Sequence, residues 1–469
     1  MKLIRLMLLA SASLSSVATA QNVVQATAPT VVAGGATYTV DATGTLRTVT
    51  QTTAKAFLDW SALDVPLDHT LRFDQPNANA ITLNRVTGNS GTVIDGRVEA
   101  NGQVWILNPN GVFISPTGRV TTPGFLASTG NISHTDFMAD TTQFAIGNGG
   151  SPAPIINEGI ITSSLGYTIL NAGIVRNSGQ IRAERGKVLL AAVDNLSVSF
   201  DQGGLISYAL SNNSSVPAVF RDITNTGTIS ANGGLVALSM ASALGAISGV
   251  INTTGLIEAK SIQSANGRVI LDAGSNGALA IKGTVTVEGA ETGEVGGFIT
   301  AQGSLVMIEP QAVLNADGNA GGGEISLMAT PALQENIDFS AFQAVNQSIA
   351  TARQSLLQQR EKLNNGSLAS VAIKQGSVLS ASARENGVGG LITVNGNGEL
   401  GLSTKIAGQL RANGAGLTGR GGTIDLSGFY LDIERATLRA IGGTSLAAPG
   451  TVKLTAASID LVEQLTPAA

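Results

Sequence analysis

The chain has 469 residues, with 58 glycines, 13% charged residues, 4% aromatic residues and no cysteine. Without cysteine there are no disulfides, thiolate metal sites or cysteine nucleophiles. A net charge of −5 with sparse Lys and Arg also gives no basic surface for nucleic acid. Few charges and many glycines indicate short strands joined by glycine turns, with thin aliphatic layers in place of one large core.

The N-terminus has the pattern of a secretory signal peptide. Lys2 and Arg5 precede a short apolar run, and Ala18–Ala20 is a small-x-small cleavage site. We therefore expect a signal peptide over residues 1–20 and a mature chain that begins at Gln21. The apolar run is too short to span a bilayer and no later stretch reaches ~18 apolar residues, so we expect no transmembrane segment.

The most informative segment is Asn108–Gly111, an Asn-Pro-Asn-Gly sequence between two apolar, strand-like runs. The proline pushes Asn108 towards extended geometry. Pro109 presets the φ of the second turn residue, whereas Asn110 and Gly111 tolerate positive φ. The segment predicts a strand, a tight turn and a second strand.

Further blocks accompany this turn in a fixed order along the chain. They are residues 56–60, 71–76, 83–88, 94–98, 124–129, 188–192 and 206–209. Together with the turn, the blocks resemble the secretion domain of two-partner secretion exoproteins of the filamentous haemagglutinin and high-molecular-weight adhesin type. The resemblance covers roughly residues 35–260.

The resemblance implies a secretion domain over residues 21–265 and a non-enzymatic, secreted protein. Such a chain binds the POTRA domains of a cognate outer-membrane barrel transporter in the periplasm. It then folds outside a Gram-negative cell, where it is extracellular or on the outer surface. The residues assigned to this step are Asn84, Arg85, Asn108, Pro109, Asn110 and Gly111. We expect them to form an early turn and a docking surface, although they could merely let the first coils close.

The physiological role implied by the family is less specific. Adhesion, haemagglutination, biofilm building or carriage of a binding activity are all compatible, with host or bacterial surface glycans or proteins as partners. Because the sequence stops at Ala469 without a long shaft, we expect a short released protein or a small adhesin.

An Asn-x-Gly-x-Ile pattern recurs along the chain. Copies begin at Asn157, Asn177 and Asn225, and a looser copy begins at Asn252. Later copies, which lack the asparagine but keep the same alternation, begin at Leu314, Leu379, Leu410 and Leu438. Strand-length runs with glycine corners predict an all-β, right-handed parallel β-helix, which continues over residues 266–469. Ile181, Ile229 and Ile257 should point into the rod, and the asparagines should stack as a ladder or simply favour turns.

One segment, near residues 333–364, breaks this pattern. Phe342, Val345, Ile349 and Leu356 follow a helical spacing. We interpret the segment as a helical excursion packed on the flank of the rod. A partner-binding or oligomerising helix is the alternative.

No catalytic, metal or cofactor site is predicted. Gly443–Pro449 resembles the nucleophile segment of subtilisin-like proteases, with Ser445 as the nucleophile. A base is required as well, and the chain has only two histidines, His69 and His134, neither in a matching motif. Two isolated histidines without cysteine also supply no metal-ligand cluster.

The densest carboxylate group consists of Asp59, Asp64, Asp68 and Asp74. Parallel β-helices host pectate lyases and glycosidases, so a carbohydrate-active enzyme is the alternative function. Because a glycosidase needs two carboxylates across one bond, we interpret these aspartates as solvated turn residues. A carboxylate cluster on one outer face of the rod would favour the enzyme.

Overall fold

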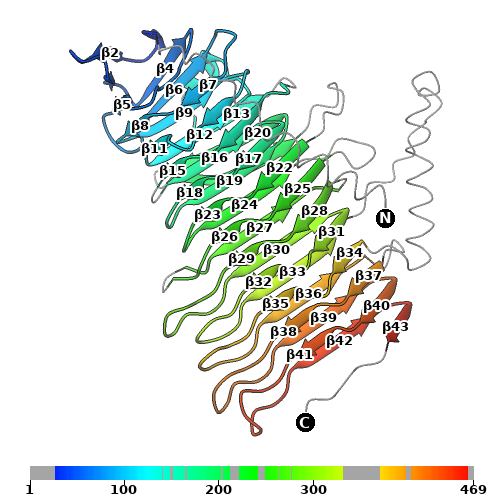
Figure 1. The fold of residues 1–469 in the computed structure, drawn as a ribbon. Helices are drawn as coiled ribbons and strands as arrows, with labels where there is room; N and C mark the ends of the chain where they lie inside the picture. The colour runs from blue at the N-terminus through cyan, green and yellow to red at the C-terminus, as the bar shows by residue number, and fades with distance from the viewer. Residues whose placement is uncertain are drawn as a thin grey trace, which may run out of the picture.

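A computed structural model describes residues 27–139, 141–147, 151–163, 166–201, 204–211, 221–240, 249–262, 265–275, 277–330, 370–397 and 403–462. These ranges contain a single α-helix, α2 (His134–Met138), and otherwise strands that stack along a rod (Figure 1). The predicted parallel β-helix is confirmed. The expected signal peptide, residues 1–20, and the expected excursion near 333–364 lie outside the described residues.

Three long sheets form the faces of the rod. Sheet A has fourteen strands: β1 (Thr30–Ala33), β4 (Lys55–Trp60), β6 (Ile81–Val86), β9 (Gln103–Leu107), β12 (Gly124–Ser128), β16 (Tyr167–Asn171), β19 (Lys187–Ala192), β24 (Leu235–Met240), β27 (Arg268–Asp272), β30 (Phe298–Gly303), β33 (Glu324–Ala329), β36 (Leu391–Asn395), β39 (Thr423–Ser427) and β42 (Thr451–Thr455). Sheet B also has fourteen: β2 (Ala36–Val40), β3 (Leu46–Gln51), β5 (Thr70–Asp74), β8 (Arg97–Ala100), β11 (Arg119–Thr121), β15 (Ile160–Thr162), β18 (Gln180–Arg182), β23 (Thr228–Ser230), β26 (Leu256–Glu258), β29 (Thr284–Thr286), β32 (Val313–Asn315), β35 (Val378–Ser380), β38 (Gln409–Arg411) and β41 (Thr437–Arg439). Sheet C has twelve: β7 (Thr92–Ile94), β10 (Val112–Ile114), β14 (Pro154–Asn157), β17 (Ile174–Asn177), β22 (Arg221–Asn225), β25 (Gly249–Thr253), β28 (Gly277–Ile281), β31 (Leu305–Ile308), β34 (Val371–Ile373), β37 (Ser403–Ile406), β40 (Tyr430–Glu434) and β43 (Ser458–Val462).

The interior of the rod consists mainly of columns of aliphatic side chains, with Trp60, Phe73 and Phe125 among them in the first coils. Ile181, Ile229 and Ile257 pair in parallel register on neighbouring strands of sheet B, and none of them is exposed to solvent. The later copies continue the same column, because Ile257 pairs with Val285 and Val285 with Leu314. Leu379, Leu410 and Leu438 then pair in turn. The predicted inward positions and the predicted register are therefore confirmed.

A ladder of buried asparagines runs inside one corner. The Nδ2 of Asn157 donates to Oδ1 of Asn177 at 2.7 Å, and Nδ2 of Asn177 donates to Oδ1 of Asn225 at 2.8 Å. The fourth rung is Thr253, whose Oγ1 accepts from Asn225 at 3.4 Å. The alignment that placed Asn252 in the ladder is wrong by one residue, because Asn252 pairs with the residue before Asn225 and side chains alternate between the two faces of a strand.

Glycine lines two corners because the backbones of successive coils touch there. A Cβ on Gly227 would lie 2.1 Å from the carbonyl oxygen of Gly179, and one on Gly422 would lie 2.1 Å from that of Gly390. No side chain tolerates such a distance. Comparable close approaches recur at Gly179, Gly255, Gly283, Gly234, Gly297, Gly323, Gly390 and Gly450.

The N-terminal end of the rod is closed by strands that run the other way. β1 pairs with β4, and β2 with β3, in antiparallel fashion, whereas the strands that follow in the three sheets pair in parallel. Such reversed strands interrupt the parallel edge that another chain could otherwise extend.

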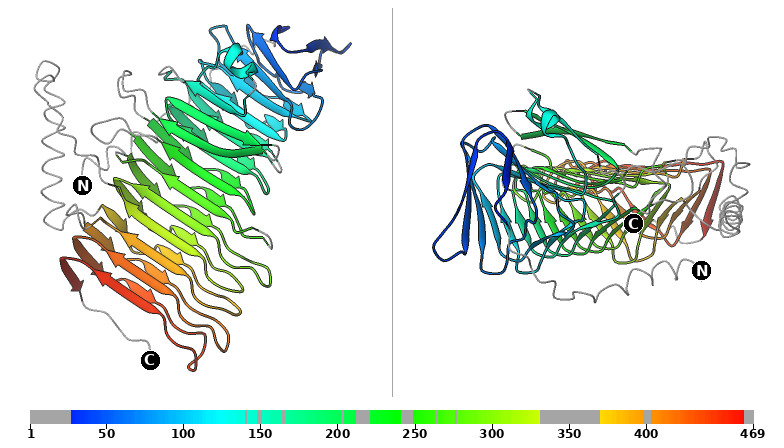
Figure 2. Two further views of the ribbon diagram at one scale, coloured as in Figure 1. Left: turned by 180° about the vertical axis from the view of Figure 1, so that it is seen from behind. Right: turned by 90° about the horizontal axis from the view of Figure 1, so that it is seen from above.

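A second layer covers the outer face of sheet A near this end. It comprises α2 and an antiparallel sheet of β13 (Gln143–Gly147), β20 (Asn195–Asp201) and β21 (Gly204–Ser211) (Figure 2). Trp105 of sheet A packs against Phe137, Phe144 and Phe200 of the layer, with ring centroids 5.1–5.7 Å apart. Lys55 donates to the carbonyl oxygen of Ala139 at 2.7 Å and lies 4.9 Å from the centroid of the Phe144 ring.

Sequence reasoning did not predict this layer, although a signal was present. Strands β9 and β12 are buried at every position, and each contains a continuous apolar run, Val104–Leu107 in β9 and Phe125–Ala127 in β12. Strands covered on one face alternate apolar and polar residues, whereas continuous apolar runs are typical of strands buried on both faces.

Within the described ranges, no helix is long and apolar enough to cross a membrane.

We predict that Asn177→Ala destabilises the rod by about 2–4 kcal/mol. The change removes two ladder contacts and leaves the buried amide groups of Asn157 and Asn225 without those partners. Urea unfolding measures the loss. The control is Asn319→Ala, which removes one side-chain contact to the backbone in an exposed setting. Equal midpoints for the two variants would contradict a stabilising ladder.

Candidate functional site

The Asn108–Gly111 turn is held together by the side chain of its first residue. Asn108 is fully buried, and its Oδ1 accepts from the backbone N–H of Asn110 at 2.9 Å. Its Nδ2 donates to the carbonyl oxygen of Ser90 and to Oγ1 of Thr92, both at 3.0 Å. Ser90 and Thr92 belong to the preceding coil. The side chain therefore closes the turn and also ties two coils together.

Gly111 takes the positive φ that the turn requires. Its φ is 95°, whereas Asn110 is not among the residues with positive φ. A Cβ at Gly111 would also lie 2.6 Å from the carbonyl oxygen of Pro154 in the following coil. The predicted turn is confirmed, and glycine is required by both the local conformation and the next coil.

The middle of the turn faces solvent beside a shallow groove. Pro109 and Asn110 are exposed, and Nδ2 of Asn110 donates to the carbonyl oxygen of Gly88 at 2.9 Å. The groove is lined by Arg85, Val86, Thr87, Gly88, Asn89, Pro109, Asn110, Gly130 and Asn131. The lining includes three asparagines and Arg85, so the groove offers hydrogen-bonding side chains to another polypeptide.

Asn84 and Arg85 lie on opposite faces of β6. Asn84 is buried inside the rod, where its Oδ1 accepts from the indole N–H of Trp60 at 3.0 Å and its Nδ2 donates to the carbonyl oxygen of Trp105 at 3.1 Å. Arg85 points outward to the groove. Neighbouring residues of a strand face opposite sides, so these two predicted site residues cannot share one surface.

Arg85 is fixed in position by its neighbours. Its Nε and one terminal nitrogen donate to the two carboxylate oxygens of Asp59 at 2.8 and 2.7 Å. The guanidinium also lies 4.8 Å from the centre of the Phe57 ring. Asp59 uses two of the five N–H donors of Arg85, and the others can reach an incoming chain.

Sequence reasoning missed Gly88 and Asn131 as members of the groove. Gly88 lies within the block over residues 83–88, so a signal for it was present. The sequence gives no signal for Asn131, because this residue reaches the groove only through its pairing with Gly147 of β13. The N–H of Asn131 donates to the carbonyl oxygen of Gly147 at 2.6 Å. The groove therefore adjoins the second layer.

The four aspartates do not form an acid/base pair. Asp68 is an exposed turn residue, as predicted. Asp74 is exposed but ends strand β5, and Asp59 and Asp64 are not solvated turn residues. Asp59 lies on β4 in its ion pair with Arg85. Asp64 is buried and accepts from the N–H of Val93 at 2.7 Å, and burial raises its pKa to about 6.

The protease-like segment has no histidine beside it. Ser445 lies in the loop between β41 and β42, near the end of the rod drawn in red in Figure 1. His69 lies in a turn, where its N–H donates to the carbonyl oxygen of Pro66 at 3.0 Å, and His134 begins α2. Both histidines belong to the opposite end. A subtilisin-like site needs a histidine as the base of its serine, so the resemblance of this segment does not extend to a catalytic triad.

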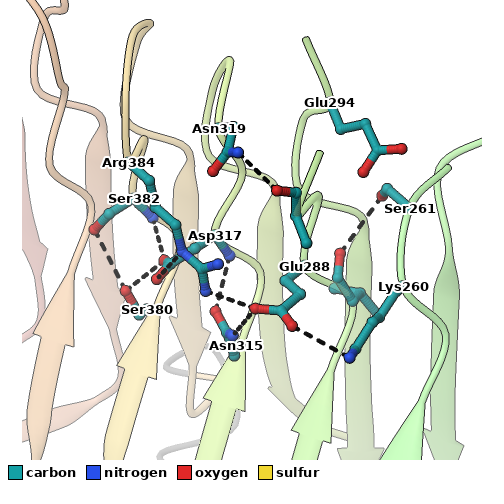
Figure 3. A network of polar contacts seen from close by, with 12 residues as sticks. Lys260, Ser261, Glu288, Glu294, Asn315, Asp317, Asn319, Ser380, Ser382 and Arg384 are labelled. Atoms are coloured by element: carbon teal, nitrogen blue, oxygen red, sulfur yellow. Dashed lines mark hydrogen bonds and ion pairs between the residues drawn. The ribbon is translucent and has the colours of Figure 1, made fainter. Parts of the chain in front are cut away.

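A polar network that was not predicted lies on an outer corner of the rod (Figure 3). Glu288 accepts from Arg384 at 2.6 Å and from Asn315 at 3.2 Å, and it lies 3.4 Å from Nζ of Lys260. Asp317 lies 3.7 Å from Arg384. Partial burial raises the pKa of Glu288, but the hydrogen bonds and charges of Arg384 and Lys260 lower it overall.

This network is the kind of carboxylate cluster that would favour an enzyme, but its carboxylates are paired. A glycosidase needs one carboxylic acid with a raised pKa that can donate a proton. Glu288 is instead held ionised by cations on the same face. The network joins loops from successive coils. In the part of the chain that the structure describes, no group of three or more His, Asp or Glu could hold a metal ion.

Comparison with known proteins identifies relatives of the chain. The model of a family described as the TPS secretion domain matches residues 20–294. Two proteins of Haemophilus influenzae, both named "Heme/hemopexin-binding protein", are 30% identical over 241 residues and 29% identical over 269 residues. The matches cover 50% and 52% of this chain but 26% and 28% of those proteins. The chain thus spans about a quarter of the length of these relatives.

A solved structure shares the fold. The crystal structure of the HMW1 secretion domain from Haemophilus influenzae matches with a TM-score of 0.67, at 23% identity, over 91% of this chain and 100% of that chain. At this identity the match supports the fold alone. The family match extends past residue 265, and sheets A, B and C continue across that position without a break.

We predict that Gly111→Ala destabilises the protein more than Gly44→Ala. Both glycines have positive φ, so both variants lose about 1–2 kcal/mol from backbone strain. A Cβ at Gly44 meets open space, whereas one at Gly111 meets the carbonyl oxygen of Pro154. The extra contact should cost about 1–3 kcal/mol more in urea unfolding. Identical stability of the two variants would show that the next coil does not restrict the turn.

Proposed function

The chain belongs to the TPS secretion domain family, and on that premise we propose that a cognate POTRA-barrel transporter engages it at the groove beside the Asn108–Gly111 turn. Membership of the family makes the chain a two-partner secretion exoprotein, exported across the outer membrane of a Gram-negative cell by its transporter. The surface that the transporter contacts is the proposed part.

The observation that carries the proposal is the division of the six predicted site residues between two environments. Asn84, Asn108 and Gly111 are buried and close the first coils. Pro109 and Asn110 are exposed, and Arg85 lies beside them in the groove. Coil closure accounts for the buried three. Asn110 and Arg85 also bond to neighbouring coils, but closure does not require a proline, an amide and a guanidinium to lie together at one surface.

The position of the groove also favours an early role in export. It is formed where β6, β9 and β12 end, next to the antiparallel strands that close the N-terminal end of the rod. Groove and closing strands come from the same few coils. A transporter that holds this part of the chain would hold the coils on which all later coils stack.

Outside the cell, we propose that the protein acts as an adhesin or a surface-interaction protein. The two curated relatives carry a binding function in their names, but this chain matches only about a quarter of each. Binding of haem or haemopexin is therefore an alternative function for this chain. Surface glycans and proteins are the other candidate partners.

A carbohydrate-active enzyme is the alternative of another class, and two observations argue against it. The carboxylates of the outer network are ion-paired with Lys260 and Arg384. Asp64, whose pKa is raised, is buried and accepts a hydrogen bond from the N–H of Val93, so it does not face a groove. Neither arrangement offers a proton donor and a second carboxylate across a substrate bond.

We predict that Asn110→Ala lowers secretion at least about tenfold when the cognate transporter is co-expressed. The variant loses an exposed hydrogen bond to Gly88 and a longer, partly buried one to Asn108, which should cost only about 1 kcal/mol of stability. Immunoblots of culture medium and periplasm measure secretion, and urea unfolding of refolded protein measures stability. Material should accumulate in the periplasm or be degraded there.

Two variants serve as controls for this experiment. Asn319→Ala removes a comparable exposed contact far along the chain, and Ser445→Ala removes the protease-like hydroxyl. Both should be secreted like the wild type. Normal secretion of Asn110→Ala would refute docking at the groove, whereas wild-type secretion without any transporter would remove the family premise itself.

A further inference from the structure

Loops that join sheet B to sheet A form a continuous ledge along one corner of the rod (Figure 1). In the early coils these connections are short, residues 183–186 and 231–234. Later they are residues 287–297, 316–323, 381–390, 412–422 and 440–450, and we call these five segments the loop ledge. Bridges join Gly318 to Gly289 and Ala383, and Gly387 to Ala415, so the loops are stacked and ordered.

The last three loops of the ledge expose large apolar side chains. Leu446 is 88% exposed, Leu417 is 76% exposed, Val388 is 52% exposed and Ile441 is 50% exposed. The loops contact each other, since Oγ1 of Thr444 donates to the carbonyl oxygen of Leu417 at 3.3 Å. A single exposed leucine needs no explanation, but four such residues on three neighbouring loops mark an interaction surface.

Three arginines without acidic partners lie in or directly before the last two loops. Arg411 and Arg439 stand in register on β38 and β41, directly before the last two loops, and Arg420 lies in one of them. No ion pair among the described residues includes any of the three. Glu385 is the one acidic residue in the three loops. In the earlier loops, by contrast, Glu288 neutralises its cations in the network of Figure 3.

We propose that the C-terminal part of the loop ledge docks on an anionic lipid surface. Leu417 and Leu446 would enter the interfacial region of the membrane, while Arg420 and Arg439 contact lipid phosphates. Exposed apolar tips flanked by basic residues gain from both apolar burial and attraction to anionic headgroups.

A second copy of the chain is the less suitable occupant. A two-fold contact brings the same patch of both copies together, so it would place the positive charge of one patch against the positive charge of the other. An apolar protein partner would cover the leucines but would leave the unpaired guanidinium groups unexplained. Lipid phosphate accounts for both features of the patch.

Sedimentation with lipid vesicles tests the proposal on the secreted chain. The wild type should bind vesicles of phosphatidylglycerol and phosphatidylcholine, and binding should weaken as salt increases. The double variant Leu417→Ser/Leu446→Ser should bind at least about tenfold less. Each of Arg420→Gln and Arg439→Gln should lower the affinity by about fivefold.

The matched control is Val31→Ser/Leu67→Ser, which removes two exposed apolar side chains near the other end of the rod. It should bind like the wild type, and all variants should keep the wild-type circular dichroism because the changed residues are exposed. Absence of binding by the wild type, or equal binding by the double leucine variant, would overturn the proposal. Self-association that the leucine variant abolishes would also overturn it, by assigning the patch to a contact between copies.

Discussion

Contact between the backbones of successive coils at the glycine corners is the constraint on which the rest of this structure depends. At Gly227 and Gly422 a Cβ would lie 2.1 Å from the carbonyl oxygen of the preceding coil. The close approach lets strands pair in parallel on three faces at once, and columns of mainly aliphatic side chains fill the space between the sheets, with Trp60, Phe73 and Phe125 in the first coils. The high glycine content follows from it. A second group of aromatic side chains lies under the second layer, around Trp105.

Much of this arrangement could be predicted from the sequence, because each copy of the sequence pattern forms a coil of the same geometry. The Asn-x-Gly-x-Ile pattern predicted the column of Ile181, Ile229 and Ile257, and the aliphatic copies predicted its continuation. The pattern failed at Thr253, where a hydroxyl replaces the amide. The neighbouring Asn252 was aligned with the ladder instead, which is wrong by one residue. The second layer escaped prediction because its strands are excursions between coils and do not share the repeat.

The candidate site was predictable in part for a related reason. Local turn chemistry is sufficient to place the Asn108–Gly111 turn, but which residues share a surface depends on strand pairing. Asn84 and Arg85 are adjacent in sequence, yet one bonds Trp60 inside the rod and the other holds Asp59 outside. The groove also needs Asn131, which pairing with Gly147 brings into place. A motif that reads as one unit in the sequence therefore serves coil closure with its buried atoms and, in our proposal, transporter contact with its exposed ones.

Site-specific photo-crosslinking during export tests the transporter contact most directly. A photoreactive amino acid at Thr87, an exposed residue of the groove, would be compared with one at Asn319, on a loop of a later coil. The account predicts that export-arrested chains crosslink to the POTRA domains of the transporter from position 87 and far less from position 319. Equal crosslinking from both positions, or none from position 87 while chains are being exported, would contradict it.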